Sequence, residues 1–125
     1  MAAMTGRSIL IVEDEPLIAM MLEDFVEGLG HSTVGSADTV EDALDYVARG
    51  GFDLVILDVN LGKTECWPIA DALAGRSIPF ILATGGHVSK PPSQYAGVPT
   101  LQKPFTFDSV RDALESLNVP ERDIG

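Results

Sequence analysis

The chain of 125 residues is 46% hydrophobic and 22% charged, so it is long enough to fold as one globular domain without disulfide or metal staples. Its formal net charge of -11 disfavours binding to nucleic acid and to anionic membrane surfaces. A single cysteine excludes an internal disulfide, and no apolar run is long enough to span a membrane, so we expect a cytoplasmic protein.

Short apolar segments alternate with helix-like segments along the chain. The hydrophobic pattern predicts strands over residues 8–12, 31–35, 52–57, 78–83 and 98–102. Helices are expected after Pro16, after a capping pattern that begins at Asp38, over residues 68–73, and after a cap at Thr106. Between Gly85 and Gly97, two glycines and a pair of prolines disfavour a helix of normal length.

Strands that alternate with helices form right-handed βαβ units, and such units build a parallel sheet. The second strand is half-polar and the fifth contains Pro99, so we place both at the edges of the sheet. The sequence therefore predicts an α/β fold with a doubly wound, five-stranded parallel sheet in the flavodoxin-like order 2-1-3-4-5. In that order the first and third strands are neighbours.

Polar residues follow these strands where each one ends. Glu13 and Asp14 follow the first strand, and Asp58 follows the third. Because the C-terminal ends of parallel strands meet at one edge, these carboxylates converge there and would repel one another without a cation such as Mg²⁺. Thr84 and Lys103 end the fourth and fifth strands and add donors for an anion. The cluster therefore suits the transfer of a phosphoryl group onto Asp58.

These residues, in this order and context, resemble the receiver domains of two-component response regulators over residues 7–117. The resemblance implies that Asp58 accepts a phosphoryl group from a sensor histidine kinase, that Thr84 contacts this group and that Lys103 pairs with it. It also implies a cis peptide bond before Pro104. The implied Mg²⁺ ligands are Glu13, Asp14, Asp58 and the backbone carbonyl of Asn60.

A narrower resemblance rests on the stretch from Pro79 to Gly86, which is similar to the signature of the FAT GUY subgroup of receivers. Members of that subgroup often stand alone and often work with HWE-type histidine kinases. The chain departs from ordinary receivers at Thr100, where an aromatic residue is usual, and at Gly62, where a proline is usual.

Two short segments flank the receiver-like span. Residues 1–6 are expected to form a flexible N-terminus, and residues 118–125 a C-terminal tail that is too short for an output domain. The expected output is contact with a downstream protein, or phosphotransfer to another receiver with this chain acting as a phosphate sink. Neither nucleic acid nor a membrane surface is expected as a partner.

Two other classes of protein remain open. A Mg²⁺-dependent phosphohydrolase of the haloacid dehalogenase class also forms an aspartyl-phosphate, but its nucleophile follows the first strand and a second acid stands two residues later. Here Asp14 is followed by Pro16 at that offset. Turnover of a small phosphate monoester would favour the phosphohydrolase, and stoichiometric labelling would favour the receiver. A purely structural interaction domain would show no dependence on Mg²⁺.

Some isolated signals indicate no function. The stretch from Leu61 to Thr64 ends like a phosphate-binding P-loop, but Leu57 stands where the first glycine of that motif is required. His31 and His87 have no metal-spaced partner, and we expect both at the surface.

Overall fold

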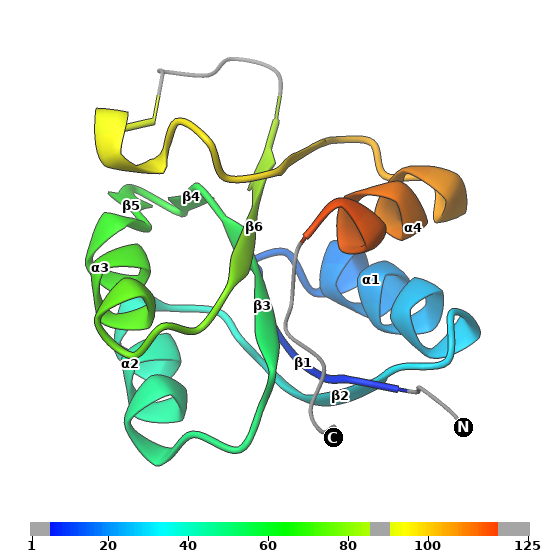
Figure 1. Ribbon diagram of the computed structural model, residues 1–125, viewed down its shortest axis with the longest axis horizontal. Helices are drawn as coiled ribbons and strands as arrows, with labels where there is room; N and C mark the ends of the chain where they lie inside the picture. Colours follow the sequence, from blue (N-terminus) through cyan, green and yellow to red (C-terminus); the bar gives the residue numbers. More distant parts are fainter. Residues whose placement is uncertain (1–5, 86–90, 118–125) are drawn as a thin grey trace.

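The computed structural model describes residues 6–85 and 91–117, which form a central sheet flanked by helices (Figure 1). Five strands make this sheet, all parallel, in the order β2-β1-β3-β6-β7. Since β6 and β7 are its fourth and fifth strands along the chain, the predicted order 2-1-3-4-5 is confirmed. The strands and helices in chain order are β1 (Ser8–Val12), α1 (Pro16–Gly28), β2 (Ser32–Ala37), α2 (Val40–Arg49), β3 (Leu54–Asp58), β4 (Asn60–Leu61), β5 (Thr64–Glu65), α3 (Trp67–Gly75), β6 (Phe80–Thr84), the 3-10 turn η1 (Ser93–Tyr95), β7 (Thr100–Gln102) and α4 (Phe107–Ser116).

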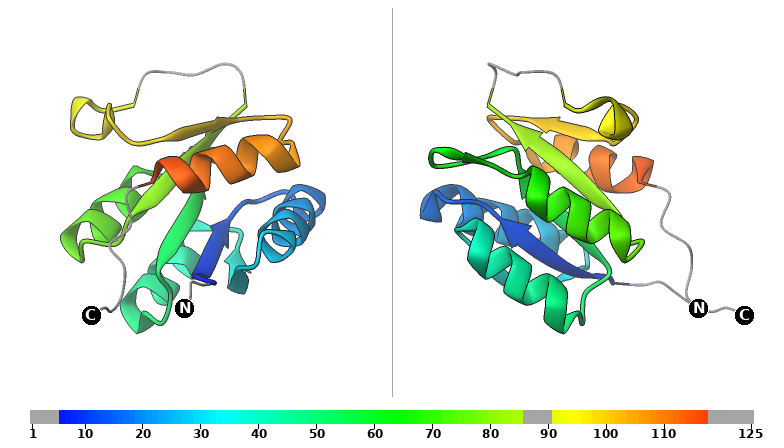
Figure 2. Two further views of the ribbon diagram at one scale, coloured as in Figure 1. Left: turned by 45° about the vertical axis from the view of Figure 1, so that its right-hand side comes forward. Right: turned by 90° about the vertical axis from the view of Figure 1, so that its left-hand side faces the viewer.

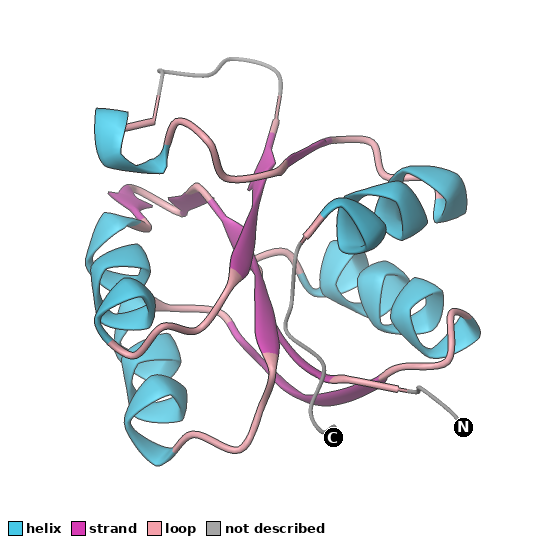
Figure 3. Cartoon of the chain, viewed as in Figure 1, coloured by secondary structure: helices cyan, strands magenta, loops and turns pink. Residues whose placement is uncertain are grey.

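Helices cover both faces of the sheet, as the views from different sides show (Figure 2). α2 and α3 pack on one face, where Leu10 and Val12 of β1 point, and α1 and α4 pack on the other, where Ile9 and Ile11 point. Strands therefore lie between two helical layers (Figure 3). Burial of both faces explains why the central strands are continuous apolar runs in the sequence. None of the described helices is long and apolar enough to cross a membrane.

The second strand and the second helix differ from the prediction at their ends. β2 continues to Ala37 because its pairing with β1 continues until Val12 lies opposite that residue. The cap of α2 is Thr39 and not Asp38: the Thr39 side-chain oxygen accepts a hydrogen bond of 3.1 Å from the N–H of Asp42. The capping pattern therefore lies one residue later than expected, whereas the cap of α4 is Thr106, as predicted.

A hairpin that the sequence analysis did not predict follows β3. Its strands β4 and β5 are antiparallel, with Leu61 opposite Thr64. The stretch from Leu61 to Thr64, which resembles the end of a P-loop in the sequence, therefore forms a hairpin turn. Further along the chain, residues 91–97 contain only the short η1 turn, in agreement with the expected lack of a normal helix. The rest of that prediction, over residues 86–90, lies outside the described residues.

His31 is half-buried, which corrects its expected place at the surface. The N–H of Arg7 donates to His31 Nδ1 at 3.0 Å, so this nitrogen must be unprotonated. Burial lowers the pKa of His31, and the charge of Arg7 acts in the same direction. Neutral His31 therefore ties the end of α1 to the start of β1. His87 lies outside the described residues.

We expect the protein to lose stability as the pH falls from about 6.5, the ordinary pKa of histidine, through the lower pKa of folded His31. In this window the unfolded chain binds the proton and the folded chain does not, so acid favours unfolding. His31→Asn keeps an acceptor near Nδ1 but does not titrate. The stability that the wild type loses on acidification should be at most about 1 kcal/mol, the contribution of one hydrogen bond. The variant should therefore lose less stability over the same pH range. Urea unfolding at neutral and mildly acidic pH measures it, and an equal decline in both proteins contradicts this role of His31.

Candidate functional site

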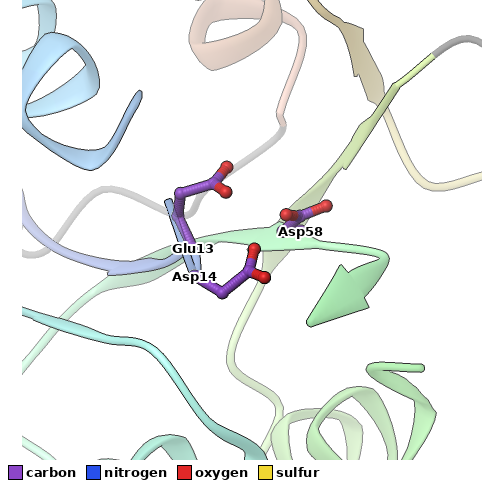
Figure 4. Close-up of side chains that lie close together, drawn as sticks. All are labelled: Glu13, Asp14 and Asp58. Atoms are coloured by element: carbon purple, nitrogen blue, oxygen red, sulfur yellow. The ribbon is translucent and has the colours of Figure 1, made fainter. Parts of the chain in front are cut away.

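The sheet brings three carboxylates together at its C-terminal edge. β1 and β3 are neighbours, so Glu13 and Asp58 leave adjacent strands at the same level. Glu13 is held there by a 2.9 Å hydrogen bond from its N–H to the carbonyl of Ala37 on β2. One ligand oxygen from each of Glu13, Asp14 and Asp58 lies within 4.8 Å of the other two, and the side chains turn toward a shared space (Figure 4). The structure therefore brings the predicted acidic residues together.

Lys103 reaches the same carboxylates from the end of β7. Its N–H donates to the carbonyl of Thr84 at 2.9 Å, and its peptide bond to Pro104 is cis, as the resemblance implied. Its Nζ lies 3.1 Å from Glu13 Oε1 and 3.2 Å from Asp58 Oδ2. Glu13 and Asp58 thus share one ammonium group.

Burial dominates the electrostatics of this cluster. Glu13 and Asp58 are only 2% and 3% exposed. Burial raises the pKa of Glu13 to about 7 and repulsion from Asp58 adds to the effect, while the N–H of Glu15 and the ammonium of Lys103 oppose it. Burial acts to lower the pKa of Lys103, but Asp58 and Glu13 outweigh it and hold that pKa above its ordinary value. One lysine therefore does not fully compensate the buried negative charge.

The state of Glu13 Oε1 indicates that the cluster fits a cation. This oxygen is buried and makes no hydrogen bond with any described residue, although Lys103 Nζ lies near it at 3.1 Å. A buried carboxylate oxygen that makes no hydrogen bond and faces one shared ammonium is incompletely compensated, and a metal ion would add the missing positive charge. Carboxylate oxygens are the ligands that Mg²⁺ prefers. The donor set of Glu13, Asp14 and Asp58 therefore fits a hard divalent cation.

Asn60 and Thr84 both lie at this edge of the sheet. The backbone N–H of Asn60 donates to Asp58 Oδ1 at 3.2 Å, so β4 begins against the acidic cluster. Thr84 is buried and ends β6, one residue after Ala83, which pairs with Asp58. It remains a prediction that the carbonyl of Asn60 binds a cation and that Thr84 contacts a phosphoryl group.

One contact of the cluster was missed by the sequence analysis. The N–H of Gly62, in the unpredicted hairpin, donates to Asp14 Oδ2 at 2.8 Å. A glycine and a lysine between Leu61 and Thr64 are a turn signal that could have predicted the hairpin. Nothing local in the sequence predicts that this turn reaches Asp14.

An aromatic contact beside the hairpin was also missed. Trp67, at the start of α3, stacks on Tyr95 of η1 with ring centroids 6.0 Å apart. The hydroxyl of Tyr95 donates to Asp71 on α3. These contacts fix the described end of the connection between β6 and β7 on α3.

Comparisons with known proteins agree with one another. The sequence profile of the response regulator receiver domain matches residues 9–115. The solution structure of SdrG from Sphingomonas melonis Fr1 is 56% identical, covers 93% of this chain and 98% of its own, and has a TM-score of 0.80. The solution structure of the BeF3-activated conformation of SdrG from Pseudomonas melonis Fr1 is 55% identical over 90% of this chain and 98% of its own, with a TM-score of 0.77. The Phyllosphere-induced regulator PhyR of Methylorubrum extorquens is 40% identical in an alignment of 89 residues, and the match covers 67% of this chain. The chain spans about a third of the length of PhyR, since the match covers 33% of it.

Replacing Lys103 by methionine should destabilise the protein, because Glu13 and Asp58 then lose their shared ammonium. Near pH 8 and without divalent cations, we expect the free energy of unfolding to fall by about 2 to 3 kcal/mol. This is a small effect for a broken buried ion pair, because Lys103 keeps some contact with solvent. The loss should shrink near pH 5.5, since the carboxyl groups of the variant take up protons there. Urea unfolding measures both values.

Lys63→Met is the matched control, because Lys63 is an exposed lysine on the hairpin turn. An equal effect of the two substitutions, or a loss from Lys103→Met that does not depend on pH, contradicts the shared ion pair.

Proposed function

Because this chain belongs to the response regulator receiver domain family, we propose that it accepts a phosphoryl group from a sensor histidine kinase on the carboxylate of Asp58. Receiver domains in general accept such groups from histidine kinases. One observation carries the assignment to Asp58: this carboxylate is buried between the ammonium of Lys103 and the acidic pair Glu13 and Asp14. Among the described residues, only Glu13, Asp14 and Asp58 form such an acidic cluster, and of these Asp58 is the residue that ends β3.

The transfer is a displacement at phosphorus. A carboxylate oxygen of Asp58 attacks the phosphorus atom, and the P–N bond to the kinase histidine breaks, with its electron pair left on the histidine nitrogen. Lys103, whose Nζ lies 3.2 Å from Asp58 Oδ2, pairs with the incoming phosphoryl oxygens. Thr84, at the end of the neighbouring strand β6, donates its hydroxyl to the same group.

Mg²⁺ is the proposed cofactor, held by Glu13, Asp14, Asp58 and the backbone carbonyl of Asn60. When bound, Mg²⁺ supplies positive charge that offsets both the acidic cluster and the phosphoryl oxygens. The buried Oε1 of Glu13 supports this assignment, because it makes no hydrogen bond and a cation would add to the single ammonium that it now faces. In this proposal Asp58 has two roles, since it is a ligand of the ion and also the nucleophile.

The relatives support a role in signalling by protein contact. The structure of SdrG in a BeF3-activated conformation supports the proposal that a chain this similar responds to a ligand of phosphoryl size. The proposed donor is a histidine kinase of the HWE type. The proposed receiver of the signal is a downstream protein or, through phosphotransfer, another receiver domain. In this proposal the chain is a phosphoacceptor and has no small-molecule substrate of its own.

Asp58→Asn should abolish phosphorylation, because the amide keeps the size of the side chain but is not a nucleophile. The measurement is the incorporation of label from a small acyl phosphate donor in the presence of Mg²⁺. The wild type should take up at most one phosphoryl group per chain, and Asp58→Asn should take up none. Asp45→Asn, which changes an exposed acid of α2, is the control and should label like the wild type. Labelling of Asp58→Asn at the wild-type yield contradicts the proposal, and continuous release of phosphate from a monoester would favour a phosphohydrolase.

Asp14→Ala should weaken Mg²⁺ binding, since it removes one of three clustered carboxylates. We expect the dissociation constant for Mg²⁺ to rise by roughly 10-fold or more, because even groups that only orient a metal ligand have effects of that size. Titration calorimetry measures the constant, and Asp24→Ala, at an exposed acid of α1, is the control. If the Asp14 variant binds Mg²⁺ with unchanged affinity, Asp14 is not a ligand.

A further inference from the structure

The hairpin after β3 presents its backbone to the acidic cluster. β4 and β5 are joined by Gly62 and Lys63, and Gly62 has a φ of +64°. A positive φ at the first of two turn residues is typical of a tight hairpin turn that requires glycine there. The hairpin begins at Asn60, two residues after Asp58, so it starts beside the C-terminal end of β3.

Two backbone N–H groups of this hairpin hold two of the clustered carboxylates. The N–H of Asn60 donates to Asp58 Oδ1 at 3.2 Å, and the N–H of Gly62 donates to Asp14 Oδ2 at 2.8 Å. One donor therefore comes from the start of β4 and the other from the turn that follows it, and both face the acidic cluster.

The glycine at position 62 is needed for its backbone conformation and not for space. A Cβ atom at this position would meet only Asp14 Oδ2, at an ordinary distance of 3.9 Å. The positive φ lets the chain turn back directly after this N–H, which reaches a carboxylate 48 positions earlier in the chain. Gly62 also lines a cleft of about 470 Å³ between the hairpin and the start of α2, with Asp14 in its wall.

We propose that the backbone N–H of Gly62 is a positioning group for the cation site, which holds Asp14 so that this carboxylate binds the ion through a single oxygen. The inference rests on the proposed function, because it concerns the same Mg²⁺ site. Oδ2 is engaged by the hairpin, which leaves Oδ1 for the cation. Hydrogen bonds of this kind orient metal ligands before the metal arrives.

The arrangement has a consequence for which cation is preferred. Mg²⁺ is small and usually takes one oxygen from each carboxylate, whereas Ca²⁺ takes more ligands and often binds both oxygens of one carboxylate. While Gly62 holds Oδ2, Asp14 cannot easily offer both oxygens. Loss of this N–H should therefore weaken Mg²⁺ binding more than Ca²⁺ binding. A group with only a structural role in the hairpin would not change this preference.

The sharpest test removes the N–H of Gly62 and keeps the glycine itself. In the full-length chain, the amide between Leu61 and Gly62 is replaced by an ester, which keeps the glycine conformation but has no donor. A second ester, between Gly62 and Lys63, is the control, because it changes the same turn and leaves the contact with Asp14 in place. Dissociation constants for Mg²⁺ and Ca²⁺ are measured by calorimetry, and thermal melts without cations check that each protein is folded.

We expect the ester at Gly62 to bind Mg²⁺ roughly 10-fold more weakly than the wild type, and the ester at Lys63 to bind it within about twofold. The ratio of Ca²⁺ to Mg²⁺ affinity should rise only for the ester at Gly62. An ester at Gly62 with unchanged Mg²⁺ affinity, or with equal losses for both cations, overturns the positioning role. A wild-type chain that binds neither cation contradicts the proposed function itself, so the two failures are distinguishable.

Discussion

The burial of Glu13 and Asp58 beside each other is the constraint on which the site depends. Two carboxylates that are almost fully enclosed repel each other, and the protein supplies one ammonium, from Lys103, within 3.1 to 3.2 Å of both. The raised pKa of Glu13, near 7, records the cost that remains. The sheet order enforces this proximity, since β1 lies beside β3, and the pairing of β1 with β2 fixes Glu13 through its N–H. The fold therefore keeps the acids together in spite of their repulsion.

Much of this could be predicted because the decisive signals are local. A strand buried on both faces is a continuous apolar run, and β1, β3 and β6 all have that form. A polar residue at the end of such a run must lie at the edge of the sheet, which is how Glu13, Asp58 and Thr84 could be placed together. The end of β2 could not be predicted in the same way, because its length is set by pairing with β1 and not by its own half-polar residues. The cap of α2 was misplaced because Asp38 and Thr39 are both good capping residues, and only the observed bond to Asp42 separates them.

Two of the contacts that sequence reasoning missed are between segments far apart in the chain. Gly62 and Asp14 are 48 residues apart, and Tyr95 and Asp71 are 24 residues apart. Such pairs depend on where the fold places two distant segments, which no hydrophobic pattern encodes. The turn itself carried a usable signal, a glycine before Lys63 between two short extended segments. That signal was overlooked because Asn60 and Leu61 make a strand of only two residues, too short to show an alternating pattern.

The site has a side made by the central sheet and a side made by the β4–β5 hairpin, and the rest of the protein holds the sheet side more firmly. Glu13 directly follows β1 and Asp58 ends β3, and these are central strands of the sheet that are buried on both faces. The hairpin has two short strands, and it is attached at its base by the N–H of Cys66, which donates to Val59 at 2.9 Å. Few contacts and exposed hydrogen bonds place such a segment at the low end of local stability. A ligand that binds both sides stabilises the folded form of each, and the less stable side has more to gain. If the site binds its proposed ligands, they should therefore order the hairpin more than the sheet. Trp67, which follows the hairpin after Cys66 and stacks on Tyr95, connects the hairpin to η1.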